Sequence, residues 1–153
     1  MKRTTTIAVA AALGLSGVTG VARAASSYGQ QVIALTNDQR AAHGCGRLAA
    51  NNALGAAARG HSGDMARHSS MSHEGTDGSD PGDRITGAGY PATEWAENVA
   101  YGQSTPKEVV TAWMDSPGHR ANILNCELAE IGVGRAVNNK GVAYWTQDFG
   151  ARG

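Results

Sequence analysis

The 153-residue sequence is poor in charge, in aromatic side chains and in cysteine. Its 13 basic side chains are matched by 13 acidic ones, which argues against a nucleic-acid-binding protein, because such a protein needs a basic stripe. Aromatic residues make up only 5% of the chain, but a hydrophobic content of 41% is enough for one packed core. The low charge argues against disorder, and the length predicts a single domain.

Long apolar runs are also missing: beyond the N-terminus no stretch of about 18 apolar residues occurs, so we expect no internal membrane span. The N-terminus has the three parts of a signal peptide: basic Lys2 and Arg3, an apolar stretch over residues 7–21 and a small-x-small site at 22–24. We predict cleavage after Ala24 and a secreted, extracellular, monomeric domain over residues 25–153. The alternative is an uncleaved anchor. The mature chain would carry 10 basic and 13 acidic residues and no polybasic patch for anionic lipid.

The two cysteines, Cys45 and Cys126, are 81 residues apart. An even number of cysteines in an exported chain suggests one disulfide bond. The alternative is a pair of free or metal-binding thiols.

Hydrophobic periodicity predicts helices in the first half of the chain. The first begins near Tyr28 and ends near residues 43–44, where Gly44 can adopt a left-handed conformation. The second covers roughly residues 51–69 and carries an alanine-rich stripe at 3.6-residue spacing, on which His61 lies. Residues 74–90 are rich in Gly, Asp and Pro, and we expect a long loop there, with one helical turn around residues 83–86.

The second half predicts strands around one further helix. Residues 97–101 are a short strand candidate, and residues 105–108 (TPKE) form a capped helix start that the Pro-Gly pair at 117–118 ends. Residues 130–137 and 142–149 predict a hairpin. Gly132 and Gly134 share one face of its first strand, which lets a helix or another backbone approach closely. Because the helices come first and the hairpin last, we expect an α+β fold.

Few residues stand out as chemically active. The chain has five histidines, of which His61 and His68 lie on the helical stripe and are expected to pack there, whereas His73 and His119 lie at a helix end and after a helix break. No HExxH, CxxC pair, GxSxG or phosphate-binding glycine loop is present. Ser116 near His119 is weak evidence for a nucleophile.

Six short motifs, in order, carry a resemblance to a known family. The chain resembles bacterial members of the CAP superfamily, also called the SCP-like extracellular family, whose relatives include cysteine-rich secretory proteins, antigen 5 and pathogenesis-related proteins. The resemblance covers about residues 32–150. The motifs are residues 61–66 (HSGDMA), 72–73 (SH), 96–100 (AENVA), 116–124 (SPGHRANIL), 131–134 (IGVG) and 145–150 (WTQDFG).

The resemblance implies an α-β-α sandwich with a small antiparallel sheet between helical layers. It also implies a central cleft lined by a His/Glu tetrad, in which His73, Glu97 and His119 match three members. Ser116 stands where eukaryotic members have the second glutamate, so the tetrad is at most a triad. Cys45 and Cys126 match the bridged pair of similar bacterial proteins.

These residues allow two kinds of function. Two neutral imidazoles with a carboxylate nearby suit zinc or another divalent ion, so His73 and His119, with Glu97 close by, are candidate metal ligands. Without metal, Glu97 could hold the tautomer of one histidine while the other acts as a base. The first hypothesis is therefore an extracellular binding module for a small apolar ligand, a metal or a partner protein. The second is a metal-dependent or serine-type hydrolase, with His73, Glu97, His119 and Ser116 as candidate catalytic residues. The third possibility is a purely structural polar network.

Overall fold

The computed structural model describes residues 26–153, so the predicted signal peptide lies outside the described residues. None of the helices in this part of the chain is long and apolar enough to cross a membrane. The elements in chain order are α1 (Tyr28–Ala42), β1 (Ala49–Ala50), α2 (Asn52–His68), α3 (Pro81–Gly87), β2 (Glu94–Tyr101), α4 (Pro106–Asp115), α5 (Pro117–Ile123), β3 (Glu130–Val137) and β4 (Ala143–Ala151).

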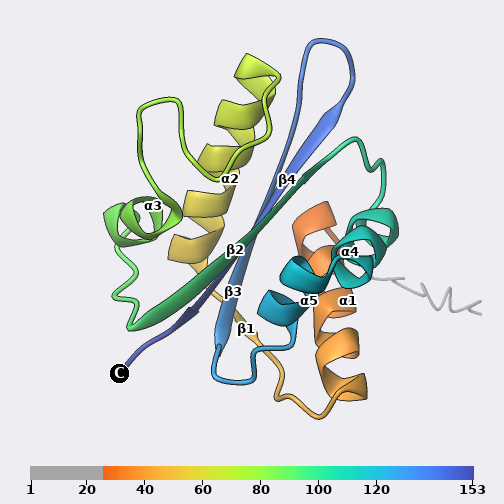
Figure 1. Ribbon diagram of the computed structural model, residues 1–153, viewed down its shortest axis with the longest axis vertical. Coiled ribbons are helices and arrows are strands. Elements are labelled where there is room, and N and C mark those ends of the chain that lie inside the picture. Colours follow the sequence, from red (N-terminus) through yellow and green to blue (C-terminus); the bar gives the residue numbers. More distant parts are fainter. Residues whose placement is uncertain (1–25) are drawn as a thin grey trace, which may run out of the picture.

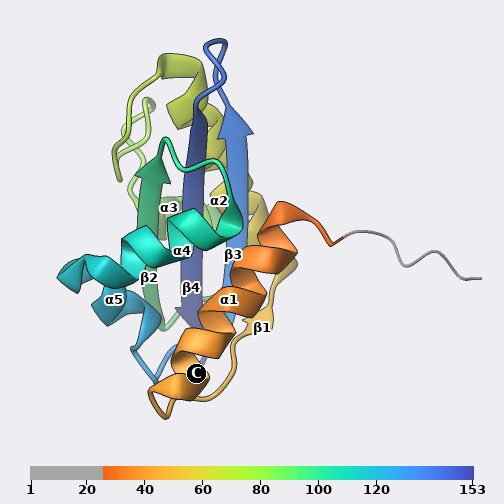
Figure 2. The same ribbon diagram turned by 90° about the vertical axis from the view of Figure 1, so that its right-hand side faces the viewer.

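The sheet lies between two helical layers. Its strand order is β1-β3-β4-β2, with β1 parallel to β3 and the other pairs antiparallel. Figure 1 shows α2 and α3 to one side of the sheet and α1, α4 and α5 to the other, and Figure 2 shows the second group crossing in front of the strands. This is the α-β-α sandwich that the resemblance implied. In this sheet β2 is an edge strand, and its only strand neighbour is β4.

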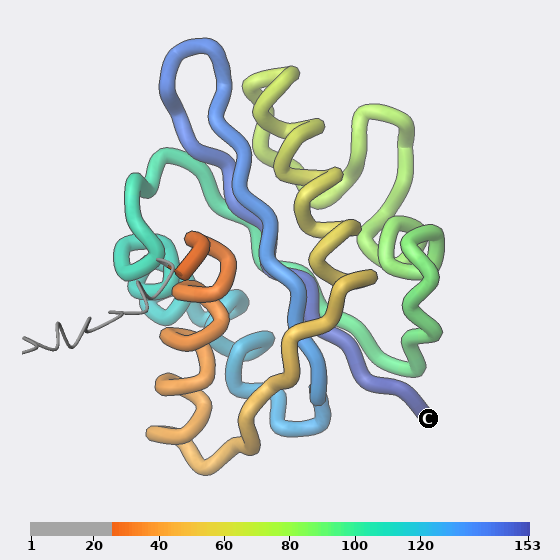
Figure 3. The backbone as a smooth tube through the Cα atoms, turned by 180° about the vertical axis from the view of Figure 1, so that it is seen from behind, coloured from red at the N-terminus to blue at the C-terminus, as the bar shows by residue number. Residues whose placement is uncertain are grey.

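The glycine-lined face of β3 is where α2 packs, as the sequence predicted. A Cβ atom added at Gly132 would collide with the backbone of Leu54 and Gly55, and one added at Gly134 would collide with the backbone at Ala58. Figure 3 shows α2 lying along the sheet at this close approach. Side chains on β3 would push the helix away from the sheet. The glycines therefore fix the distance between α2 and the strands that carry the site.

The predicted helices are present, with informative differences at their ends. Gly44, just after α1, has a φ of +81°, as the predicted left-handed end requires. The segment expected to be a loop with one turn instead contains the seven-residue α3, because Asp80 caps it reciprocally with Asp83 and Pro81 occupies its first turn. The Pro-Gly pair at 117–118 ends α4 and at the same time begins α5.

The strands are close to those expected. β2 begins at Glu94, three residues earlier than predicted, because its first residues pair with the last residues of β4. The two-residue β1 has no periodicity of its own and was not anticipated from the sequence.

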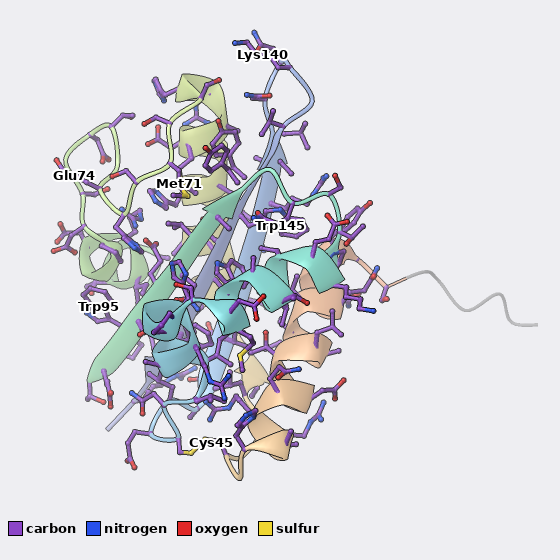
Figure 4. All side chains as sticks on the ribbon, turned by 45° about the vertical axis from the view of Figure 1, so that its right-hand side comes forward. Cys45, Met71, Glu74, Trp95, Lys140 and Trp145 are labelled. Carbon is purple, nitrogen blue, oxygen red and sulfur yellow. A yellow bond between two sulfur atoms is a disulfide. The ribbon has the colours of Figure 1, made fainter. Side chains whose placement is uncertain are left out.

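The larger apolar core lies between the sheet and the layer formed by α1, α4 and α5, and a disulfide bond links two segments at one end of this layer. The Cys45–Cys126 bond is present, joining the segment after α1 to the segment before β3. Figure 4 shows Cys45 below the end of α1. Arg40, buried beside it, donates hydrogen bonds to the carbonyls of Ile123, Asn125 and Leu128. The disulfide and Arg40 together fix the connection that places α5 beside β2.

Candidate functional site

Glu97 on the edge strand β2 is the centre of a buried polar cluster. Its side chain is 1% exposed, and each carboxylate oxygen has its own donor. His73 donates through Nδ1 to Oε1 at 2.8 Å, and Arg84 donates through a guanidinium nitrogen to Oε2 at 2.7 Å. Because Nδ1 of His73 donates to Glu97, Nε2 is the ring nitrogen that the carboxylate leaves unengaged. Glu97 thus sets both the tautomer and the direction of the imidazole.

Arg84 also holds the segment in which His73 lies. Its guanidinium donates to the backbone carbonyl of His73 at 2.9 Å and to that of Ser79 at 2.8 Å. The side chain comes from α3, the helix that the Asp80–Asp83 capping box makes possible. One side chain therefore neutralises Glu97 and fixes the loop that carries its partner histidine.

Two further ionisable side chains face Glu97 from the neighbouring elements. His61, 1% exposed on α2, lies with Nε2 3.9 Å from Glu97 Oε1 and donates through Nε2 to the carbonyl of Ser72 at 2.7 Å. Asp148, also 1% exposed, lies directly opposite Glu97 in the pairing of β2 with β4. Both belong to a polar band between two apolar clusters under α2 and α3. The clusters are Leu54, Ala57, Ile85 and Tyr90 on one side and Met65, Ala66, Val99 and Tyr144 on the other.

His119 and Ser116 come from the opposite helical layer. Both are partly buried at the start of α5. The α5 helix is held against β2 by Asn98, which donates to the His119 carbonyl, and by Asn122, which donates to the carbonyl of Glu97. Ser116 occupies the N-cap position of α5, but its side chain makes no capping hydrogen bond. Its hydroxyl is therefore not committed to the helix end.

A cavity of about 220 Å³ lies beside His119 at the end of β2. Its wall is mostly apolar, and Met71 and Tyr101 at its rim are 46% and 54% exposed. The ring of Tyr101 stacks on that of Tyr144, with centroids 5.8 Å apart. Figure 4 shows Met71 beside α2, near the sheet. The lining residues are Met71, Val99, Ala100, Tyr101, Gln103, Ala112, Trp113, Ser116 and His119.

The electrostatics of the cluster favour one buried anion, Glu97, and neutral rings at His61 and His119. Burial alone would raise the pKa of Glu97, but the hydrogen bond from His73 and the charge of Arg84 bring that pKa below its ordinary value. Burial lowers the pKa of His61 despite the attraction of Glu97. Burial also lowers the pKa of His119, and the nearby His73 lowers it further. Burial, and then the charge of Glu97, raise the pKa of Asp148 well above its ordinary value.

The predicted site residues lie on both sides of one edge strand. His73 and Glu97 are in direct contact, and His119 lies close enough to His73 for their charges to interact. Among residues 26–153 no hydrogen bond joins the Ser116 hydroxyl to His119, so the pair is not assembled as a nucleophile and base.

A metal ion would find few ligands here. Nowhere in the described residues do three or more His, Cys, Asp or Glu side chains form a group that could hold a metal. Both oxygens of Glu97 are engaged by His73 and Arg84, which places this carboxylate behind His73 as an outer partner and not a ligand. The remaining donors are the imidazoles of His73 and His119, whose chemistry suits a weakly bound zinc ion with open positions.

Arg84 and Asp148 are the two members of the cluster that sequence reasoning missed. The signal for Arg84 was the Asp-Pro start of a helix at residues 80–81, which turns a loop residue into a helical one. The signal for Asp148 was a lone carboxylate within a strand otherwise rich in apolar residues. His61 is buried on its helix as expected, but it also lies beside Glu97.

Comparison with solved structures shows which known proteins share this fold. A solved extracellular protein with an SCP domain from Bacillus anthracis superposes with a TM-score of 0.75 at 31% identity, over 82% of this chain and 40% of that one. An outer surface protein of Borrelia burgdorferi superposes with the same TM-score at 21% identity, over 81% of this chain and 92% of that one, and shows the shared fold. Both are similar in architecture to this chain.

The family itself follows from the sequence comparison. The profile of the cysteine-rich secretory protein (CAP) family matches residues 33–149, and the chain belongs to this family. It is 39% identical to the Bacillus subtilis protein YkwD over 124 residues, which cover 81% of this chain and 47% of YkwD. It is 32% identical to the B. subtilis membrane protein YlbC over 120 residues, 78% of this chain and 33% of YlbC. The chain thus matches less than half the length of either relative.

Proposed function

We propose that this CAP domain is an extracellular binding module whose ligand lies at the edge of β2. The ligand would place an apolar part in the 220 Å³ cavity and a polar part near His73 and His119. The observation that carries the proposal is the cavity itself, in which a mostly apolar wall meets an uncommitted hydroxyl at Ser116 and the imidazole of His119. Pockets that combine apolar walls with a few polar groups are typical of small-molecule sites.

The binding proposal is tested by filling the cavity. The mature domain would be titrated with fatty acids and alkyl alcohols of increasing chain length, with backbone amide NMR shifts as the readout. The Ala112→Trp variant should weaken binding by about tenfold or more, because the new ring occupies space that the ligand needs. The matched control is Ala121→Trp on α5, an exposed position outside the cavity wall. Equal affinities of the wild type and Ala112→Trp would place the ligand elsewhere.

A hydrolase is the second candidate, and the His73–Glu97 hydrogen bond favours it. A carboxylate that orients an imidazole and leaves its other nitrogen free is the arrangement of a general base. Purified protein would be tested on peptide, ester and peptidoglycan substrates. Turnover that disappears in His73→Ala and His119→Ala, while both variants stay folded, would favour an enzyme. Turnover that survives both substitutions would exclude these histidines from the chemistry.

Export of the domain is part of the same proposal. The signal peptide pattern supports it, as do the extracellular and surface relatives. N-terminal sequencing of protein recovered from the culture medium should give Ala25 as the first residue. Protein retained in the cell with Met1 still present would contradict export by cleavage.

A further inference from the structure

Asp148 is a buried carboxyl group that the proposed binding site does not use directly. It sits in the middle of β4, opposite Glu97 on one side and Gly132 on the other. The side chain is 1% exposed, and in the described residues no N–H or O–H group donates to either of its oxygens. An ionised carboxylate normally accepts several hydrogen bonds when it is buried, and leaving them unmade is costly. The surroundings of Asp148 therefore do not suit a second negative charge.

The charges that face Asp148 lead to the same conclusion. Glu97 faces Asp148 from β2, and Glu97 is itself flanked by His61 from α2, His73 from the segment after α2 and Arg84 from α3, whereas the neighbouring β3 contributes the uncharged Gly132. The one permanent cation, Arg84, is bonded to Glu97. His61 donates its Nε2 proton to the carbonyl of Ser72, its Nδ1 has no hydrogen-bond partner among residues 26–153, and burial lowers its pKa, all of which favour a neutral ring. One cation thus balances one anion, and a second anion would have no partner.

We propose that Asp148 is held as a neutral carboxylic acid that donates its proton to Glu97, and that it thereby acts as a positioning residue for the Glu97–His73 pair. Two carboxyl groups that face each other across neighbouring strands share one proton more readily than they carry two charges. The donated proton would hold the carboxylate of Glu97 from the β4 side, while His73, from the segment after α2, and Arg84, from α3, hold its two oxygens. Burial and the charge of Glu97, which both raise the pKa of Asp148, agree with this arrangement.

Direct observation of the carboxyl group tests the first half of the inference. In the mature domain labelled with ¹³C at aspartate side-chain carboxyls, the Asp148 signal is assigned by its loss in Asp148→Asn. It should have the shift of a protonated carboxyl at neutral pH, where an aspartate with the reference pKa of about 3.9 is ionised. A carboxylate shift for Asp148 at neutral pH would overturn the proposal and would indicate that bound water supplies its donors.

Two substitutions test the positioning role. Asp148→Asn keeps a neutral donor, and Asp148→Leu keeps similar bulk without a donor. The His73 ring N–H signal, which reports the bond to Glu97, should persist in the Asn variant and be lost or broadened in the Leu variant. At neutral pH the unfolding equilibrium constant of Asp148→Asn should be at least about tenfold smaller than that of the wild type, because the wild type must take up a proton to fold and the variant need not; below about pH 4 the two should agree within about threefold, since one neutral donor replaces another. Equal stability of Asp148→Asn and the wild type at neutral pH would mean that folding does not change the ionisation of Asp148, which would refute the proposal.

The protonation state of Asp148 does not depend on which ligand the domain binds. A role of the positioned His73 in ligand binding, however, rests on the proposed function. If Asp148→Leu does not fold, the carboxyl signal of the wild type and the stability of Asp148→Asn still decide the question. Protonated Asp148 in a protein that binds none of the tested ligands would refute the proposed function alone. Ligand binding in a protein whose Asp148 is ionised would refute this inference alone.

Discussion

Replacing Arg84 by alanine should lower the free energy of unfolding by about 3–5 kcal/mol at neutral pH, because it leaves a buried carboxylate without its cation. The Glu97 side chain is 1% exposed and that of Arg84 is 12% exposed, so water replaces the lost partner poorly. The variant also loses two hydrogen bonds to the backbone of the segment that carries His73.

The loss should depend on pH in a definite direction. Burial raises the pKa of Glu97, but His73 and Arg84 lower it more, so in the wild type it lies below its unfolded-state value of about 4.3. The stability that Glu97 contributes is then present above that value and is lost as pH falls through the lower folded-state pKa. Without Arg84, burial raises the folded-state pKa of Glu97. The variant therefore loses stability only at pH values at which Glu97 is ionised. The difference between the two proteins should therefore be largest above about pH 5 and shrink in acid.

Urea unfolding followed by tryptophan fluorescence between acid and neutral pH measures this difference. The matched control is Arg67→Ala on α2, which removes a 3.4 Å ion pair with Asp64 whose arginine side chain is 68% exposed. It should change stability by less than about 0.5 kcal/mol, as exposed pairs of this kind do. A loss in Arg84→Ala that is below about 1 kcal/mol, or the same at every pH, would refute the reasoning.

Three further outcomes follow from the structure. Reduction of the disulfide, which closes an 81-residue separation, should cost up to about 4.5 kcal/mol on the chain-entropy estimate, and a reduced protein with an unchanged thermal midpoint would contradict this. Gly134→Ala should lower the free energy of unfolding, measured in urea, by about 3 kcal/mol or more, because the α2 backbone cannot move aside. Gly60→Ala in α2, which has open space around it, should raise that free energy by about 0.5–1 kcal/mol. Similar values for the two variants would contradict the close packing. Calorimetric zinc titration should detect at most weak binding at neutral pH, lost on acidification and abolished in His73→Ala or His119→Ala; tight binding that survives either substitution would place the metal elsewhere.

The sequence predicted the fold closely because its signals were local. The helix caps, the glycine face of β3 and the hairpin turn each depend on residues near one another in the chain. The family resemblance added the layer order and singled out His73, Glu97 and His119, of which His73 and Glu97 are in direct contact. These were the parts of the site that short motifs could carry.

The rest of the site depends on contacts that no single motif contains. Asp148 lies opposite Glu97 only through the register of two strands about 50 residues apart, and that register could not be read from either strand alone. Arg84 reaches Glu97 only because α3 forms within a segment whose composition is typical of a loop. His61 satisfied the helical pattern, which gave no reason to expect a polar neighbour across the sheet.

The position of β4 has a consequence for how the chain assembles. It is the last strand in chain order among the described residues, yet it lies in the middle of the sheet, buried from Ala143 to Gly150. The edge strand that carries Glu97 has no other strand neighbour, so it cannot join the sheet until β4 is available. Such non-local pairing makes folding slow. During synthesis, the buried carboxylate of Glu97 can therefore take its place in the sheet only after β4 has been made.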